Sequence, residues 1–215
     1  MIIVLLGPPG AGKGTQGEHL SEELAIPKIA TGDVLRAAVR EGTPLGLAAK
    51  AAMERGDLVP DDVILGIMKE ALASPSAARG AILDGVIRTT PQAEGLARVL
   101  AELGRTLDAV LVVDVPDEAI VERLSARTVC DVCQRPFTGR APGERCDADD
   151  HELQGTLVRR KDDEPDAIRN RLAVYQRQTA PVIDWYRTHG AALKFVDGMG
   201  TQDEVLTRIR TTLGL

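Results

Sequence analysis

Aromatic side chains are scarce in this sequence, because Phe, Trp and Tyr together make up only 2% of the 215 residues. Proteins that bind single-stranded nucleic acids stack the bases on such side chains, so a stacking surface of this kind is not expected. Positive charge is also in deficit, since the formal net charge at pH 7 is -6. An acidic chain lacks the basic face that binds nucleic acids. We therefore expect no nucleic-acid partner.

Long apolar runs are missing as well. No run approaches the roughly 20 apolar residues that a helix needs to span a bilayer. The first run, Ile-Ile-Val-Leu-Leu at 2–6, is too short for the core of a signal peptide, and no basic residue precedes it. We therefore expect no membrane association, a cytoplasmic location and a monomer.

Cysteine is rare too, with Cys130, Cys133 and Cys146 as its three occurrences. An odd number of cysteines disfavours a disulfide framework and favours metal or redox chemistry. The spacing is Cys-x₂-Cys followed by Cys-x₂-Asp, which ends at Asp149. Such pairs suit a tetrahedral structural zinc site, with Asp149 as the fourth ligand and His151 as its rival. The alternative is a metal-free loop that carries reactive thiols.

Apolar runs alternate with helical segments along the rest of the chain. This order predicts an α/β fold in which one doubly wound parallel sheet of five strands carries helices on both faces. The expected strands are 2–6, 28–30, 80–85, 109–113 and 193–196. The expected helices are 13–24, 34–40, 45–55, 61–73, 91–103, 117–127, 165–188 and 202–213. Hydrophobic periodicity is lost over 128–164.

A glycine-rich stretch, Gly-Pro-Pro-Gly-Ala-Gly-Lys-Gly-Thr at 7–15, follows the first expected strand and opens the first expected helix. Glycines let consecutive backbone N–H groups turn toward one anion, and the helix N-terminus adds partial positive charge. In this context the stretch predicts a phosphate-binding loop (P-loop), with Lys13 reaching the outer phosphates of a nucleoside triphosphate. The alternative is an ordinary Gly/Pro turn before a helix.

The hydroxyl that usually follows the P-loop lysine and holds Mg²⁺ is missing, because Gly14 stands there and Thr15 comes one residue later. Mg²⁺ is therefore expected to find a carboxylate elsewhere, through water. Asp84 ends the third expected strand. Since ligands of open α/β sheets bind at the carboxyl ends of the strands, we expect Asp84 to lie beside the loop.

Three stretches together resemble the adenylate kinases, a family of nucleoside monophosphate kinases. They are the P-loop, Thr-Gly-Asp-Val-Leu-Arg at 31–36, and Asp-Gly-Val-Ile-Arg at 84–88 with Gln92 four residues on. The family has Phe and Pro where this chain has Val86 and Ile87. The resemblance covers the whole chain, and its cysteines are similar to the Cys₃Asp site of the long, zinc-bearing bacterial form.

The resemblance implies an acceptor site for AMP. Thr31 and Gln92 contact the adenine, Arg36 and Arg88 hold the monophosphate, and the backbone of 57–59 lies over the base. Relatives that prefer UMP or CMP carry a small residue in place of Thr31. The full acceptor set implied is Thr31, Arg36, Asp57, Leu58, Val59, Gly85, Val86, Ile87, Arg88, Gln92, Arg160 and Arg171.

The resemblance also implies a donor site for MgATP. Its residues are Gly10, Ala11, Gly12, Lys13, Gly14, Thr15, Arg123, Arg127, Pro136, Phe137 and Gly200. The groups expected to act on the transferring phosphoryl group are Lys13, Asp84, Arg88, Arg123, Arg160 and Arg171. Each of these arginines alone could equally be a solvated helix charge. Together they suit phosphoryl transfer, which needs positioning and cations around charged oxygens.

The implied reaction is reversible exchange of MgATP and AMP with two ADP, supported by Mg²⁺ and a structural Zn²⁺. The implied divisions are a core of 1–29, 60–126 and 165–215, an AMP-binding lid of 30–59 and a zinc-bearing ATP lid of 127–164. Lid closure would exclude water, which could otherwise accept the phosphoryl group. The alternatives are a kinase for UMP, CMP or GMP, and a non-enzymatic nucleotide-dependent switch or zinc-ribbon binding module.

Overall fold

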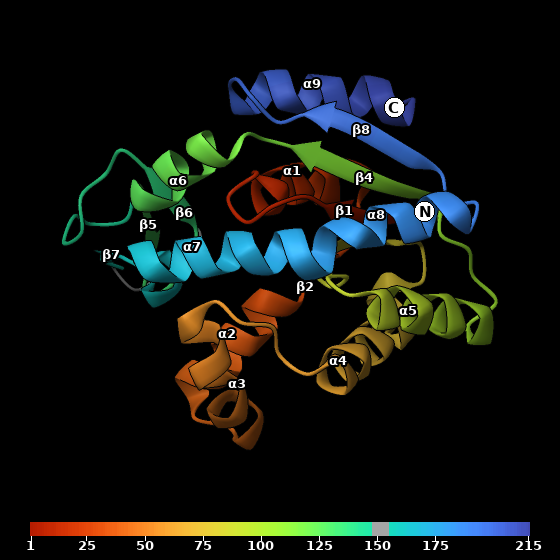
Figure 1. Cartoon of the computed structure of the whole chain (residues 1–215), viewed down its shortest axis with the longest axis horizontal. Coiled ribbons are helices and arrows are strands. Elements are labelled where there is room, and N and C mark those ends of the chain that lie inside the picture. Colours follow the sequence, from red (N-terminus) through yellow and green to blue (C-terminus); the bar gives the residue numbers. More distant parts are fainter. Residues whose placement is uncertain (148–154) are drawn as a thin grey trace.

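The computed structural model describes residues 1–147 and 155–215. Its centre is a parallel sheet in the order β2-β3-β1-β4-β8 (Figure 1). The strands are β1 (Ile2–Leu6), β2 (Lys28–Ala30), β3 (Ala81–Asp84), β4 (Ala109–Asp114) and β8 (Leu193–Asp197). The predicted α/β class and five-stranded parallel sheet are confirmed.

Helices cover both faces of this sheet, and the central strand shows why. Ile2, Val4 and Leu6 of β1 point into one core cluster, while Ile3 and Leu5 point into the other. The first cluster packs under α4 (Asp61–Ala73), α5 (Thr90–Glu102) and α8 (Ala180–Thr188); the second packs under α1 (Lys13–Leu24) and α9 (Gln202–Leu213). A strand buried on both sides reads as a continuous apolar run, as this one does.

Two helices stand apart from the sheet, at the bottom of Figure 1. They are α2 (Thr31–Glu41) and α3 (Pro44–Arg55), and they pack against each other. The Thr43 hydroxyl caps α3 by accepting a hydrogen bond from the Gly46 N–H at 3.2 Å. Together with the loop to α4 they form a helical segment between β2 and α4.

Residues that lack hydrophobic periodicity form a second, smaller sheet. It is antiparallel, in the order β6-β5-β7, with β5 (Arg127–Cys130), β6 (Pro136–Thr138) and β7 (Leu157–Val158). These strands were not predicted from the sequence, because two to four residues are too few to show an alternating pattern. The helix before them, α6 (Asp117–Ser125), ends two residues earlier than expected, since Arg127 already belongs to β5.

The single long helix predicted over 165–188 is wrong in its middle. The structure has α7 (Pro165–Val174), a π-helical turn η3 (Tyr175–Thr179) and then α8. Pro181 lies in the first turn of α8. Proline has no N–H to donate and its ring collides with the carbonyl four residues earlier, which accounts for the wider turn before it.

Helix α2 begins at Thr31, three residues before the expected start at 34, so Asp33 lies in its first turn. Asp61 and Asp62 lie in the first turn of α4. Two short 3₁₀ turns, η1 (Pro75–Ala77) and η2 (Lys161–Asp163), complete the described elements. In the described part of the chain, no helix is long and apolar enough to cross a membrane.

Candidate active site

The glycine-rich loop connects β1 to α1, as predicted. Gly12 precedes α1 with φ 91°, a backbone conformation that favours glycine. The ammonium group of Lys13 folds back over the loop, where its Nζ donates hydrogen bonds to the carbonyl oxygens of Gly7 and Pro8, each at 2.7 Å. The loop therefore presents its amide groups and one cation at the N-terminus of a helix, which is an anion-binding arrangement.

Lys13 carries a charge that its surroundings disfavour. Burial, opposed by Asp84 and reinforced by the nearby Arg88, Arg171 and Arg127, lowers its pKa from 10.5 to about 8. A bound polyphosphate would oppose both unfavourable effects, because its negative charge stabilises the ammonium form.

Asp84 lies beside the loop, where its strand position predicts it. A Cβ atom added at Gly14 would lie 3.3 Å from Asp84 Oδ2, so glycine at this position keeps the space next to the carboxylate open. A carboxylate oxygen beside a phosphate-binding loop is the hard donor that Mg²⁺ prefers, with water completing its shell. The residues present therefore fit Mg²⁺.

A pocket lies between the sheet edge, at Gly85 after β3, and the helices α2 and α3. Nine of the twelve predicted acceptor residues line it: Thr31, Arg36, Asp57, Leu58, Val59, Gly85, Arg88, Gln92 and Arg171. Arg160 is not part of its lining in the described chain. Its lining in the described chain does not include Val86 and Ile87, which are 0% and 1% exposed and pack in the core. Val86 and Ile87, which stand where the family has Phe and Pro, thus lie behind the pocket.

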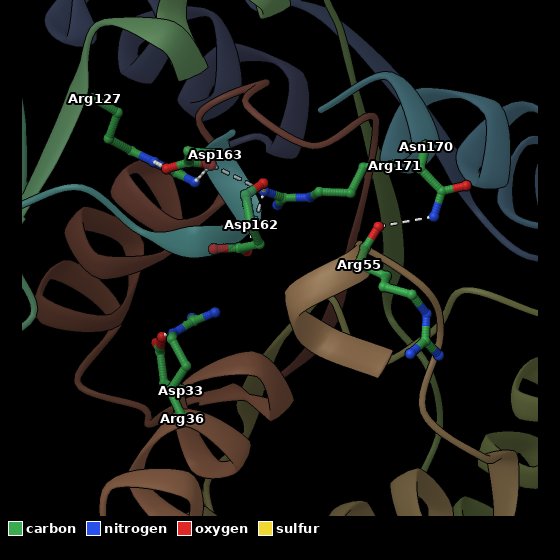
Figure 2. Close-up of polar contacts among 8 residues, drawn as sticks. All are labelled: Asp33, Arg36, Arg55, Arg127, Asp162, Asp163, Asn170 and Arg171. Atoms are coloured by element: carbon green, nitrogen blue, oxygen red, sulfur yellow. Dashed lines mark hydrogen bonds and ion pairs between the residues drawn. The ribbon is translucent and has the colours of Figure 1, made fainter. Parts of the chain in front are cut away.

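Two arginines bring positive charge into this pocket. Arg88 Nε donates to the Gly85 carbonyl at 2.9 Å, and burial lowers the Arg88 pKa to about 10. Arg36 forms an ion pair with Asp33 through Nη2 (Figure 2), and its buried Nε has no partner among the described atoms. That Nε is a donor available to an anion.

The small sheet brings further arginines to the same place (Figure 2). Arg127 donates to both oxygens of Asp163, at 2.8 and 2.6 Å. Arg171 Nη1, from α7, donates to Asp163 Oδ1 at 3.0 Å and lies 3.1 Å from Asp162 Oδ2. Burial, together with repulsion from Arg36 and Arg127, lowers the pKa of Arg160 to about 10. These arginines therefore crowd one region of like charge.

The loop over the pocket is tied to α7. Asn170 Nδ2 donates to the Arg55 carbonyl oxygen at 2.9 Å (Figure 2) and to Asp57 Oδ1 at 2.7 Å. Arg55 Nε in turn donates to Asp57 Oδ2 at 2.8 Å. These contacts fix the backbone at 55–57 and close the pocket on the side of α7.

The remaining predicted donor residues lie in α6, in β6 and after β8. Arg123 Nη2 donates to the Gly198 carbonyl at 3.0 Å and so contacts the segment before Gly200. Pro136 and Phe137 lie in β6, where the guanidinium of Arg140 stacks 5.2 Å from the centre of the Phe137 ring. These residues come from three separate parts of the sequence.

The three cysteines also meet. Their sulfur atoms all lie within 4.8 Å of one another, and those of Cys133 and Cys146 are 3.8 Å apart. Zn–S bonds of about 2.3 Å in a tetrahedron separate sulfurs by about 3.8 Å. The N–H groups of Val132 and Cys133 point at Cys130 Sγ, both at 3.4 Å. An added Cβ at Gly155 would collide with that sulfur. The cluster therefore fits zinc.

Asp149 and His151, the candidates for the fourth ligand, lie outside the described residues. The sequence indicated no part in the site for three acids that contact its predicted residues. Asp33 pairs with Arg36, Asp163 holds two arginines, and Asp61 contacts Gln92. The signal available was the run Arg-Lys-Asp-Asp at 160–163, in which acids follow a predicted phosphate ligand.

A P-loop at the carboxyl edge of a parallel sheet, with an arginine-lined pocket beside it, defines a nucleotide-binding α/β protein that handles phosphoryl groups. A sequence model of the adenylate kinase family matches residues 5–191. The chain is 68% identical to the adenylate kinase of Gemmatimonas aurantiaca over 99% of both chains. It is 46% identical to those of Syntrophotalea carbinolica (97% of this chain, 98% of the relative) and Methanosarcina barkeri (99% and 98%).

This chain therefore belongs to the adenylate kinase family and is a phosphotransferase of the nucleoside monophosphate kinase class. The resemblance that its motifs carry is confirmed.

Proposed function

We propose that the chain transfers a phosphoryl group reversibly from MgATP to AMP, giving two ADP. The observation that carries this proposal is the crowding of six cations between the P-loop and the acceptor pocket: Lys13, Arg36, Arg88, Arg127, Arg160 and Arg171. Burial and the neighbouring cations lower the pKa of four of them, Lys13, Arg88, Arg160 and Arg171. Two nucleotides that meet head to head bring the negative charge that such a cluster requires.

On this proposal the donor phosphates lie on Lys13 and the loop amides 10–15, and Arg123 and Arg127 reach them from α6 and β5. The acceptor base lies between Thr31 and Gln92, and Arg36 and Arg88 hold the monophosphate. Arg160 and Arg171 reach both nucleotides. An AMP oxygen is already anionic, so the chain needs to supply positioning and charge rather than a general base. Mg²⁺ bound near Asp84 would neutralise charge on the donor phosphates.

The two inserted segments act as lids in this proposal, 30–59 over the acceptor and 127–164 over the donor, on a core of 1–29, 60–126 and 165–215. The two segments already touch, since Lys161 Nζ donates to Glu54 Oε1 at 3.0 Å. Closure would exclude water from the phosphoryl group in transfer. The chain would work as a cytoplasmic monomer.

Zinc in the second lid would be structural. Cys130, Cys133 and Cys146 would hold it, with Asp149 or His151 as the fourth ligand. The support is the sulfur geometry and the distance in sequence between the cluster and the P-loop. Bound zinc would hold the short strands β5–β7 together, because a segment of this size buries little apolar surface.

The test is ADP formation from MgATP with AMP, UMP, CMP and GMP offered separately to the purified chain. We expect rapid turnover with AMP and at most a small fraction of that rate with the others. Lys13→Ala is the matched variant, which should fold but lose transfer. Turnover with UMP in place of AMP, or none with any acceptor while ATP still binds, would contradict the proposal.

A further inference from the structure

The side-chain amide of Gln92 is fixed in one orientation at the wall of the acceptor pocket. It is 1% exposed. The backbone N–H of Arg88 donates to its Oε1 at 2.7 Å, and its Nε2 donates to Asp61 Oδ1 at 2.7 Å. A backbone N–H can only donate, and a carboxylate can only accept. Both contacts therefore require the same amide orientation.

Asp61 does not line the pocket, and it acts from behind Gln92. It is the first residue of α4, and the Thr89 hydroxyl donates to its Oδ1 at 3.0 Å. The same hydroxyl accepts the Gln92 backbone N–H at 3.3 Å. The first turns of α4 and α5 are thus joined through one carboxylate, which receives the Gln92 amide.

This arrangement sets the hydrogen-bond polarity of the pocket. One N–H of Gln92 Nε2 is used by Asp61, so the other N–H is the group available as a donor. The Thr31 hydroxyl donates its hydrogen bond to the Gly85 carbonyl oxygen at 3.1 Å, so the Thr31 Oγ1 atom remains available as an acceptor. Both residues line the pocket, which therefore offers one donor and one acceptor.

The edge of adenine complements this pair, because its 6-amino group donates and its N1 accepts. Hypoxanthine and guanine have the opposite polarity, with an accepting O6 and a donating N1–H. A buried donor placed against a donor loses its hydrogen bond and repels its neighbour. The pocket thus favours a 6-aminopurine over a 6-oxopurine of the same shape.

We propose that Asp61 is a positioning residue for acceptor specificity, which holds Gln92 so that the pocket takes 6-aminopurine monophosphates and rejects 6-oxopurine ones. The inference rests on the proposed function of this pocket, and it goes further by naming the residue behind the choice of base. Asp61 touches neither nucleotide. It acts by holding the side-chain amide of Gln92 in one orientation.

The test compares AMP with IMP, which have the same shape and opposite edge polarity, as acceptors for the wild type and for Asp61→Ala. The alanine variant leaves a buried Nε2 donor without its acceptor. We expect its KM for AMP to rise about tenfold and its preference for AMP over IMP to fall by a similar factor. The kcat and the KM for ATP should change less than twofold, because the base lies away from the transferring group.

Asp61→Asn should restore most of the preference, since the Asn carbonyl oxygen can accept the same hydrogen bond. Asp61→Glu keeps the charge but moves it by one methylene, and it should lose preference in the same direction; it provides a second reading if the alanine variant does not fold. Asp62→Ala removes an equal charge from the same exposed helix turn and should behave as the wild type.

An unchanged AMP-to-IMP ratio in folded Asp61→Ala and Asp61→Glu would overturn the inference. Equal losses of kcat with both acceptors, together with a lower melting temperature, would reduce Asp61 to a structural role and overturn it as well. These outcomes differ from failure of the proposed function, in which the wild type itself would not use AMP.

Discussion

Arg127 and Asp163 form a two-bond ion pair that ties the start of the small sheet to the turn before α7, with Asp163 only 3% exposed (Figure 2). Arg171 donates to the same carboxylate from α7 at 3.0 Å. One acid thus holds two arginines that belong to the proposed phosphate site. Their positions depend on a residue that would itself repel a phosphate.

Removal of this carboxylate should therefore harm stability and catalysis together. In Asp163→Ala, the partly buried Arg127 loses both of its bonds to this carboxylate and Arg171 keeps only Asp162, so we expect the free energy of unfolding to fall by about 3 kcal/mol. We also expect kcat to fall about tenfold or more, because the arginines lose their fixed geometry. Urea unfolding and steady-state kinetics measure the two effects. The matched control is Asp166→Ala, which breaks an exposed ion pair with Arg169 and should leave both quantities unchanged.

The fold was predictable because its signals are local. An apolar run such as 2–6 marks a strand buried on both faces, and the glycine-rich loop after it fixes both the first helix and the phosphate site. The positions of Thr31, Asp84 and Arg88 at one sheet edge follow from the parallel order of the strands. The Cys-x₂-Cys spacing predicted a cluster that the structure forms.

What remained unpredicted depends on contacts between distant residues. Asp61 and Gln92 are 31 residues apart, and Arg127 and Asp163 are 36 apart, so no local pattern links them. The strands of the small sheet are too short to show an alternating apolar pattern. The loops between them are positioned by the three cysteines, which meet only in the folded chain. The π-helical turn before Pro181 was not predictable either. Helical spacing alone does not show whether a helix ends at a proline or continues through it.

The pH dependence of ATP binding should follow Lys13. Its pKa in the free protein is about 8, below the ordinary 10.5, so above pH 8 the ammonium loses its proton and its attraction for phosphate. Bound phosphates favour the charged form and should raise this pKa again. ATP affinity should therefore decline as the pH rises above 8, by up to about tenfold per unit.

Binding at pH 8.5 should take up protons, measurable by calorimetry in buffers of different ionisation enthalpy. Lys13→Met should bind without that uptake; proton uptake that persists in this variant would contradict the assignment.

Loss of one zinc ligand should affect stability more than chemistry. Cys130 is fully buried in the cluster, and Cys130→Ser should release the metal and lower the temperature at which the lid unfolds. The fall in kcat should be smaller, because the cysteines lie outside the acceptor pocket and the P-loop. Metal analysis of the purified protein, thermal unfolding and kinetics together test this.

Val132→Ala, at an exposed position between two ligands, is the control that should keep its metal. A wild-type protein that carries no zinc when purified in metal-replete medium would refute the proposed site.

The hydroxyl of Tyr186 offers a test of the core beneath α8. Tyr186 is 3% exposed, and its hydroxyl has no hydrogen-bond partner among the described atoms. A buried hydroxyl that makes no hydrogen bond loses its hydration without compensation, and burial also raises its pKa. Tyr186→Phe keeps the ring against its neighbour Trp185 and removes only the unsatisfied group. We expect the free energy of unfolding to rise by about 1 kcal/mol, with kcat and KM unchanged.

The matched variant is Tyr175→Phe, at a less buried tyrosine, and its free energy of unfolding should not rise. A loss of stability in Tyr186→Phe would mean that the hydroxyl is hydrogen-bonded to buried water in solution.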